Sequence, residues 1–361
     1  MKKSNPDTPS RRVVSGLSLE ELSSLLQPLP PFRARQIFRW ISRGVSSFTL
    51  MSDLGKDLRE ELESRFTLRS SGLSAELTDP DGTVKLLIEL RDGQRIEAVL
   101  LSDGEGRGTA CLSSQAGCPA GCVFCKTGSL GFSRNLSSGE IIEQFFYLNS
   151  RSAVSNIVIM GMGEPLLNLE ELRRALGILF DPRGLGISPR RVTVSTSGIV
   201  EGIRDLADKG PPVRLALSLT SAREELRNRL MPIGRENPLP LLKEALLYYQ
   251  KKTGRRVTLE AVLLGGLNTG KEEAAAMAAF ASGLGLIVNL IPWNPVEGLV
   301  FEGRPLREPS PAELRNFTAE LEGRGLKLSL RYRKGRAIAG ACGQLGQIRR
   351  QPAPRTGCQG L

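Results

Sequence analysis

The stretch CLSSQAGCPAGCVFC, residues 111–125, holds four of the six cysteines of this 361-residue chain. Three of them, Cys118, Cys122 and Cys125, have C-x3-C-x2-C spacing in a segment that also contains Gly117 and Gly121. Thiols this close in sequence can form disulfides, bind a zinc ion or hold a larger metal cluster.

The first two alternatives fit poorly. Six cysteines in a chain of this length, four of them bunched, do not resemble the dense disulfides of small secreted domains. Structural zinc takes four ligands, commonly in two pairs, but no second pair lies nearby and the chain has no histidine. Three thiolates on one loop suit a cubic 4Fe-4S cluster, one of whose irons then lacks a protein ligand. We therefore predict that Cys118, Cys122 and Cys125 are metal ligands.

Composition narrows the classes of function. The chain carries 49 Lys and Arg against 38 Asp and Glu, a net charge of +11, and this surplus favours a polyanionic partner such as nucleic acid. The lack of histidine excludes every catalytic triad or dyad that uses imidazole as its base. The longest apolar runs are shorter than the roughly 20 residues of a membrane helix, and no apolar signal segment follows the charged N-terminus. We expect a cytoplasmic protein with no membrane partner.

From residue 109 onward, strand-like apolar runs alternate with amphipathic helical runs. This alternation predicts six β-then-α units and hence a parallel sheet with right-handed crossovers, either doubly wound or curled into a barrel. In both cases a ligand binds at the carboxyl ends of the strands. The expected strands are 109–114, 155–160, 191–196, 213–219, 256–264, 286–292 and 326–332, and the expected helices are 138–149, 168–180, 199–209, 238–252, 270–283 and 311–323.

The segments before residue 109 have other patterns. Residues 17–68 read as a helical module with a capping box, Ser18 with Glu21. Two alternating runs around Asp92-Gly93 predict a hairpin in a small sheet. In the module we expect a buried apolar stripe that consists of Phe32, Ile37, Phe38 and Ile41. The polar face of the module carries arginines that could bind phosphates, namely Arg33, Arg35, Arg39 and Arg43. The expected organisation is a disordered N-terminus (1–16), the helical module (17–68), a β hairpin region (69–104), the α/β domain (105–348) and a flexible tail (349–361).

Polar and glycine residues follow several predicted strands. Each is more typical of a cap or a tight turn when taken alone. Together they would lie on one rim, where a ligand of the α/β domain is expected. They are Gly163 and Glu164 in NIVIMGMGEP, Ser195 in RRVTVSTSG, Ser218 and Leu219 in LALSLTS, and Asn294 in NLIPWNP.

Longer motifs carry a resemblance to a known family. CLSSQAGCPAGCVFCKTGSLGFSRNL, GMGEPLLN, VTVSTSG, LIPWNP and ACGQL resemble, in order and spacing, the RlmN and Cfr family of radical-SAM RNA adenine methyltransferases. FRARQIFRWISRGVSSF is similar to that family's helical RNA-binding module. The resemblance implies a partial (β/α)6 barrel with an N-terminal RNA-binding domain and a small β linker region. It also implies a 4Fe-4S cluster and S-adenosylmethionine as cofactors, the latter bound by Gly163, Glu164, Ser195, Ser218, Leu219, Thr220 and Asn294.

The same resemblance assigns three catalytic residues. Cys342 would take a methyl group from one S-adenosylmethionine, and a radical made from a second would remove a hydrogen atom from that S-methyl group. The resulting methylene would add to the adenine, because an electron-poor ring carbon cannot attack a sulfonium methyl group itself. Glu97 would accept the ring proton, and Cys111 would resolve the adduct by forming a transient disulfide with Cys342. The plainer alternative for these two cysteines is burial as small apolar side chains.

The family reading leaves alternatives open. The expected product is 2-methyladenosine in 23S ribosomal RNA and in the anticodon loop of transfer RNA. One alternative is methylation of adenine carbon 8. Another is that the chain is a divergent radical-SAM enzyme with a different substrate. An external electron donor such as flavodoxin and a monomeric enzyme are expected. Thr220 stands where the family usually has histidine, Ala337 and Gly340 replace an acidic residue and an alanine, and the usual acidic residue near Asn268 is lacking. Cys358, in the tail, matches no motif.

Overall fold

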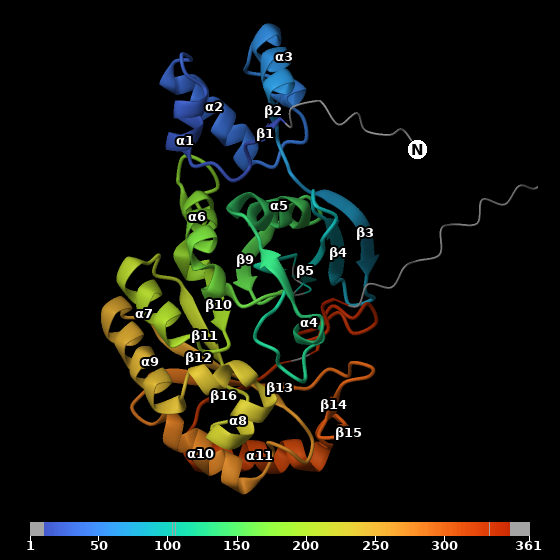
Figure 1. The fold of residues 1–361 in the computed structure, drawn as a ribbon, viewed down its shortest axis with the longest axis vertical. Coiled ribbons are helices and arrows are strands. Elements are labelled where there is room, and N and C mark those ends of the chain that lie inside the picture. The colour runs from blue at the N-terminus through green and yellow to red at the C-terminus, as the bar shows by residue number, and fades with distance from the viewer. Residues whose placement is uncertain (1–10, 103, 105, 332, 347–361) are drawn as a thin grey trace, which may run out of the picture.

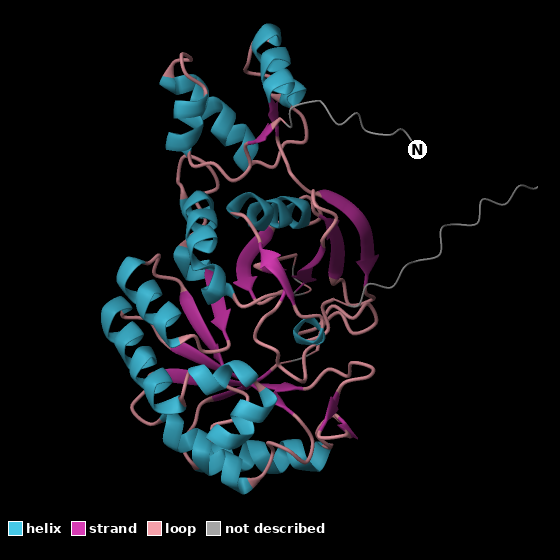
Figure 2. Ribbon diagram, in the orientation of Figure 1, coloured by secondary structure: helices cyan, strands magenta, loops and turns pink. Residues whose placement is uncertain are grey.

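The computed structural model describes residues 11–102, 104, 106–331 and 333–346. A small helical part stands at one end of the molecule, and a long curved sheet with helices along its outer side makes up the rest (Figures 1 and 2). The predicted tail, 349–361, and Cys358 lie outside the described residues. No helix of the described part is long and apolar enough to span a membrane.

The helical part consists of α1 (Leu19–Leu25), α2 (Pro31–Ser42), η1 (Phe48–Leu50) and α3 (Lys56–Arg65). The capping box of Ser18 and Glu21 opens α1 as predicted. One expectation about α2 is wrong, because Phe32 is 47% exposed while Ile37, Phe38 and Ile41 are buried. Phe32 lies in the first turn of the helix, where the Arg33 guanidinium covers its ring at 4.9 Å.

Order begins before residue 17, so the boundary predicted for the disordered N-terminus needs correction. β1 (Arg12–Val13) pairs in parallel with β2 (Phe66–Thr67) and thereby ties the start of the helical part to its end. The side chain of Val14 is 1% exposed and Ser15 Oγ donates to Glu143 Oε1 at 2.6 Å. A run of only three apolar and small residues carries no periodicity that would have predicted this strand.

The central sheet has ten strands in the order β16-β13-β12-β11-β10-β9-β6-β5-β4-β3. The seven strands from β6 to β16 run parallel, as the alternation of strands and helices predicted. They are β6 (Gly108–Cys111), β9 (Val154–Ile159), β10 (Val192–Thr196), β11 (Arg214–Ser218), β12 (Val257–Leu263), β13 (Leu286–Pro292) and β16 (Leu328–Leu330).

The predicted small sheet is not separate. β3 (Gly72–Thr78), β4 (Val84–Glu89) and β5 (Arg95–Ser102) continue the central sheet, because β5 pairs antiparallel with β6. The hairpin at Asp92-Gly93 is confirmed, with Gly93 in the left-handed region at φ +82°. Without this pairing, β6 would leave a row of unsatisfied N–H and C=O groups at the edge of the barrel.

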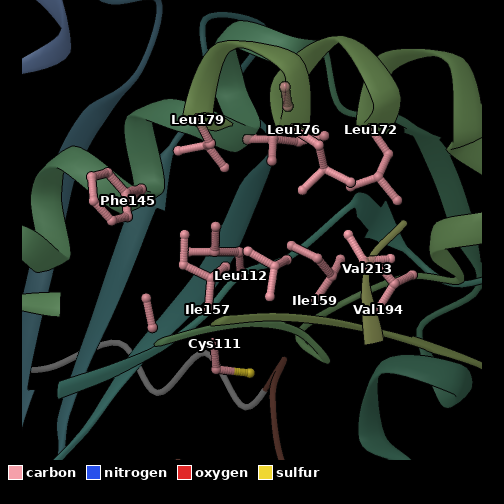
Figure 3. Packing of buried hydrophobic residues seen from close by; sticks show 14 of the residues in the cluster. Cys111, Leu112, Phe145, Ile157, Ile159, Leu172, Leu176, Leu179, Val194 and Val213 are labelled. Atoms are coloured by element: carbon pink, nitrogen blue, oxygen red, sulfur yellow. The ribbon is translucent and has the colours of Figure 1, made fainter. Parts of the chain in front are cut away.

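The main crossover helices match their predicted positions closely. α5 (Ser138–Asn149), α6 (Leu169–Phe180), α7 (Val200–Lys209), α9 (Leu239–Thr253), α10 (Lys271–Ala281) and α11 (Pro311–Gly323) connect successive strands. Figure 3 shows Leu172, Leu176 and Leu179 of α6 facing Ile157 and Ile159 of β9, whereas the side chain of Cys111 points away from this layer.

Shorter elements complete the rim of the barrel. α8 (Glu224–Leu230) and η4 (Pro232–Glu236) follow β11 and were not predicted, since a seven-residue charged helix carries little apolar periodicity. β7 (Gln115–Gly117) pairs with β8 (Phe132–Asn135), and between them lies α4 (Lys126–Ser129). The others are η2 (Pro165–Asn168), η3 (Pro189–Arg191), β14 (Val300–Phe301) and β15 (Arg304–Pro305).

The described C-terminal segment after β16 returns to the opposite end of the sheet. It passes beside α4 and the turn between β3 and β4 (Figure 1). Gly335 N donates to Asp81 Oδ2 at 2.8 Å, and Ala337 N donates to Asp79 Oδ2 at 2.7 Å. These bonds bring Cys342, which is remote in sequence, over the hairpin strands.

Candidate active site

The three closely spaced cysteines occupy the loop between β7 and α4. Cys118 N donates to Gly131 O at 2.8 Å and Cys125 N donates to Cys122 O at 3.2 Å, so the backbone is fixed at both ends of the motif. Gly117 has φ +79°, and a Cβ there would lie 2.1 Å from the carbonyl oxygen of Gly131. The loop therefore needs glycine at this position to close against β8.

The environment of these thiols fits a metal cluster. Burial, with the nearby Glu164 carboxylate and Cys125 thiol, raises the pKa of Cys118 to about 12. Burial also raises the pKa of Cys122, and the nearby Cys125 and Cys118 thiols raise it further. Bare thiolates are thus unfavourable here, and a group carrying positive iron would offset both the burial and their mutual repulsion.

A cluster makes a different geometric demand from a single ion. Within the described ranges, no three Cys, Asp or Glu side chains are gathered closely enough to hold one metal ion. In a cubic cluster each thiolate binds a separate iron, so the three sulfurs stand further apart. The apolar side chains around the loop, among them Phe124 and Trp293, would keep water from such a cluster. The donor set therefore fits a 4Fe-4S cluster.

Glu164 is anchored at the end of β9. Ser197 N and Ser197 Oγ donate to Glu164 Oε2 at 2.6 Å and 2.7 Å, and Leu166 N donates to Oε1 at 3.1 Å. Burial nevertheless raises the pKa of this carboxyl. A Cβ on the neighbouring Gly163 would lie 2.6 Å from Gln115 Cβ, so glycine is required for this approach. The family motif did not single out Ser197 or Gln115, which position Glu164.

The other predicted strand-end residues lie on the same rim. Ser195 Oγ and Ser218 Oγ, at the ends of β10 and β11, are 3.3 Å apart. Asn294 Nδ2, after β13, donates to the carbonyl oxygen of Cys342 at 3.1 Å. The backbone N–H of Leu219 donates to Glu260 O at 2.9 Å. The parallel register thus brings together residues separated by about a hundred positions in the chain.

Thr220 has an unusual conformation. Its φ is +58°, and its Oγ1 is buried and has no hydrogen-bond partner. A β-branched residue in the left-handed region is strained, and an orphaned hydroxyl adds a cost of about 1–3 kcal/mol. Asn268 Nδ2 donates to the carbonyl oxygen of Thr220 at 2.8 Å and supports the turn.

Arg227 of α8 is a residue that the sequence did not reveal. Its side chain is fully buried, and its guanidinium donates to the carbonyl oxygens of Ser197, Ser218 and Leu219. Burial lowers the pKa of Arg227 to about 10, partly offset by the proximity of Cys122. One cation thereby ties the loops after β10 and β11 together beside the cysteine loop. In the sequence it was one arginine among many in a charged run.

Glu97 and Cys111 lie on the inner face of the sheet, and Cys342 lies near Cys111. In the register of β5 and β6, Val99 lies opposite Cys111, so Glu97 and Cys111 occupy diagonal positions on one face. Both cysteines are free thiols. Burial raises the pKa of Cys111, and the nearby Cys342 raises it further. The structure thus brings Cys342 near Cys111, from which it is remote in the sequence.

The Glu97 carboxylate has two polar partners. Gly346 N donates to Glu97 Oε2 at 3.0 Å, and Lys85 Nζ lies 3.5 Å from Oε1. Burial raises the pKa of the Glu97 carboxyl, while Lys85 and the Gly346 N–H act in the opposite direction. Lys85 was not among the residues singled out from the sequence.

A cleft opens beside Glu97. It has a volume of about 340 Å³ and reaches from the β4–β5 turn at Gly93, Gln94 and Arg95 to the loop around Phe132. Glu97 and Gly346 line its inner part. Phe132 is 49% exposed at its rim, where an aromatic ring can stack on a nucleobase.

The departures from the family motifs are accommodated locally. Ala337 lies in the turn held by Asp79, and Gly340 N donates to Gly335 O at 2.8 Å. Near Asn268, a Cβ on Gly265 would lie 2.1 Å from the Arg307 guanidinium, which pairs with Glu313 at 2.7 Å. Asp79 and Glu313 are the carboxylates that make the contacts near Ala337 and Gly265.

Comparisons with known proteins match most of the chain. Residues 112–278 match the model of the radical SAM superfamily, and residues 14–68 match that of the ribosomal RNA large subunit methyltransferase N-terminal domain. A probable dual-specificity RNA methyltransferase RlmN from Treponema denticola is 51% identical over 93% of this chain and 96% of its own length. A probable dual-specificity RNA methyltransferase RlmN from Rhodopirellula baltica is 43% identical over 94% of this chain and 92% of its own length. The crystal structure of a radical SAM methyltransferase from Sphaerobacter thermophilus superimposes with a TM-score of 0.88, at 39% identity over 93% of this chain and 99% of that one.

Proposed function

Since this chain belongs to the RlmN family of radical-SAM RNA methyltransferases, we propose that it methylates carbon 2 of adenine in 23S ribosomal RNA and in transfer RNA through a methyl group carried on Cys342. The observation that carries this proposal is that Cys342 lies near Cys111, in a segment whose Ala339 carbonyl and Gly346 N–H contact Lys85 and Glu97, and Glu97 lines a cleft.

The cofactors are assigned by the donor groups of the rim. Cys118, Cys122 and Cys125 would hold a 4Fe-4S cluster, which when bound supplies the electron that splits S-adenosylmethionine. Glu164 at the end of β9 and the hydroxyls on β10 and β11 are placed to orient the amino acid part of that cofactor. The residues for this role are Gly163, Glu164, Ser195, Ser218, Leu219, Thr220 and Asn294.

Cys342 is suited to carry the methyl group. Burial raises the pKa of its thiol, and the nearby Glu260 carboxylate raises it further while Arg331 acts in the opposite direction. The first methyl transfer, in which the thiol loses its proton, is therefore the step at which Cys342 needs this cation. Once methylated, the sulfur is uncharged, so the nearby Glu260 carboxylate no longer disfavours it.

Glu97 and Cys111 complete the reaction on the RNA. After the methylene carbon on Cys342 has bonded to the adenine, the ring becomes aromatic again by losing one electron, which the oxidised 4Fe-4S cluster would take up, and the carbon-2 proton, which Glu97 would accept. The Cys111 thiolate then attacks the sulfur of Cys342, a disulfide forms, and the carbon–sulfur bond breaks. The released carbon takes up one proton, so the product is a methyl group.

The RNA would be held between the barrel and the N-terminal helices. Arg35, Arg39 and Arg43 are exposed on α2, and Arg43 stacks over the Trp40 ring at 5.6 Å. Phosphate contacts from such arginines position the RNA, while the cleft beside Glu97 receives the extruded adenine. Such a substrate and the reduced thiols favour a cytoplasmic enzyme, to which a flavodoxin-type donor would supply electrons.

Nucleoside analysis tests the proposal. Purified enzyme with a reconstituted cluster, reductant and S-adenosylmethionine is incubated with fragments of ribosomal and transfer RNA, and the digested nucleosides are identified by mass spectrometry and chromatography. The proposal expects 2-methyladenosine. Appearance of 8-methyladenosine would support the carbon 8 alternative, and the absence of any methylated adenosine would refute an RNA adenine substrate.

A further inference from the structure

Lys85 is a buried cation in a strand where an apolar residue would be expected. Its side chain is 5% exposed and that of Glu97 is 3% exposed, and the ion pair between them joins the adjacent strands β4 and β5. Removing a lysine ammonium from water costs several kcal/mol, and buried ion pairs are often no more stabilising than the apolar residues that could replace them. Fold stability alone therefore gives no reason for Lys85.

The pair contacts both ends of one short segment. Lys85 Nζ donates to the carbonyl oxygen of Ala339 at 3.3 Å, and Glu97 Oε2 accepts from Gly346 N at 3.0 Å. We call residues 339–346, which contain Cys342, the Cys342 segment. Its ends are thus held by the two partners of a single ion pair.

Separate contacts hold the middle of the segment. Asn294 Nδ2 donates to Cys342 O at 3.1 Å, and Lys126 N donates to Gly343 O at 2.8 Å. Thr127 Oγ1 donates to Leu345 O at 2.7 Å. These bonds tie the middle to the metal loop and to β13, whereas the side chains that reach the two ends are those of Lys85 and Glu97.

We propose that Lys85 is a positioning residue that keeps Glu97 ionised beside the cleft and fastens the Cys342 segment over it. The inference rests on the proposed role of Glu97 as the proton acceptor. Lys85 acts through Glu97 and through the Ala339 carbonyl.

The charge balance gives Lys85 a second consequence. Before the adenine proton moves, an ammonium faces a carboxylate, and both contacts to the Cys342 segment are charge-assisted. When Glu97 accepts the proton it becomes neutral, so it loses its attraction to Lys85 and its bond from Gly346 N weakens. The segment loosens at the stage when the sulfur of Cys342 has to reach that of Cys111.

The test compares Lys85→Met, which keeps the length of the side chain but removes its charge, with Lys85→Arg, which keeps the charge. Lys252→Met is the matched control, because Lys252 forms an exposed ion pair with Asp208 on the far helices. Thermal unfolding of each variant checks that it is folded. Glu97→Gln removes the same ion pair by neutralising its other partner.

The first readout is hydrogen exchange in the cluster-loaded protein without RNA. Loss of either charge should weaken the bond from Gly346 N to Glu97 by at least about 1.4 kcal/mol. The Gly346 amide should therefore exchange about tenfold faster in Lys85→Met and in Glu97→Gln. Lys85→Arg and Lys252→Met should exchange like wild type. Unchanged exchange in both neutral variants would overturn the inference, whether or not the protein methylates adenine.

The second readout is turnover. Loss of an oriented, ionised base should lower kcat of Lys85→Met by about 10-fold to 100-fold with KM changed little, and protein–RNA adduct should accumulate, while Lys85→Arg recovers part of the rate. Equal kcat and equal adduct in Lys85→Met and Lys252→Met would overturn it. Failure of wild type to form methyladenosine would instead refute the proposed function, and the exchange result would still decide whether Lys85 fastens the segment.

Discussion

Glu97 on β5 and Cys111 on β6 stand in diagonal positions on the inner face of the sheet, because Val99, two residues after Glu97, pairs with Cys111. This relationship follows from the antiparallel joining of the hairpin strands to the barrel. A shift of the register by one residue would turn one of the two side chains to the other face. The proposed base and resolving thiol thus depend on a hairpin that lies outside the parallel strands.

Removal of a cluster ligand should abolish both the cluster and activity. In Cys118→Ala, the two remaining thiolates leave a second iron without a protein ligand, so we expect little bound iron after reconstitution and no methyladenosine. Iron content and visible absorption measure the cluster. Cys358→Ala, which removes a thiol that matches no motif, should retain both; equal iron in the two variants would contradict the assignment.

The two remaining thiols should have opposite effects on the covalent adduct. Cys111→Ala should accumulate RNA joined to Cys342, because no thiol is left to attack its sulfur. Cys342→Ala should form no adduct, because nothing can carry the methyl group. Denaturing gels with labelled RNA distinguish the two, and adduct in Cys342→Ala would exclude the proposed intermediate.

The rate of the proton-transfer step should fall as the pH is lowered through the pKa of Glu97, since only the ionised carboxylate accepts a proton. Burial raises that pKa, so the acid limb should lie above the ordinary carboxyl value of 4.5. Lys85 favours the ionised form, and its loss in Lys85→Met should therefore move the limb to higher pH. Single-turnover rates measured against pH check this, with Lys252→Met as control. Coincident acid limbs in all three proteins would count against it.

Arg227 should contribute strongly to the stability of the fold, because it ties together the loops of the candidate site. Arg227→Met leaves three carbonyl oxygens without their buried donor, so we expect a loss of about 2–4 kcal/mol in the free energy of unfolding. Arg204→Met removes an exposed partner of Glu244 at 3.9 Å and should cost less than about 1 kcal/mol. Denaturant unfolding measures both, and similar losses would show that Arg227 has no special structural role.

The exposed arginines of α2 should contribute affinity for RNA without sequence specificity. Replacing Arg35, Arg39 and Arg43 with glutamine should weaken binding and lower the salt dependence of the binding constant by about one unit of slope for each phosphate that is no longer bound. The matched control replaces Lys251, Lys252 and Arg256, which are exposed at the end of α9 and the start of β12. The RNA-binding constant of each variant is measured over a range of salt concentrations. Equal salt slopes for the α2 variant and the control variant would exclude α2 from the interface.

The sequence was sufficient for features that depend on local periodicity. Strands such as β13 were predicted at their bounds, because consecutive apolar residues between helical patterns are typical of a buried parallel strand. The capping box of Ser18 and Glu21 also formed as expected. The cysteine spacing singled out the loop between β7 and α4 without any knowledge of the fold.

Features that depend on tertiary contact could not be predicted in the same way. Phe32 fits an apolar stripe by spacing, yet it lies in the first turn of its helix, where a side chain can remain exposed. Lys85 and Arg227 look like ordinary surface charges until the segments that bury them are in place. The β hairpin showed its turn but not the strand to which it would be joined.

The most direct test of the account follows one methyl group. Enzyme whose Cys342 has been charged with a trideuterated methyl group is mixed with RNA, reductant and unlabelled S-adenosylmethionine, and the first-turnover nucleosides are analysed by mass spectrometry. The account predicts 2-methyladenosine that retains two deuterium atoms, because one is removed from the S-methyl group before the carbon joins the ring. First-turnover product without deuterium, with the label still on Cys342, would contradict it.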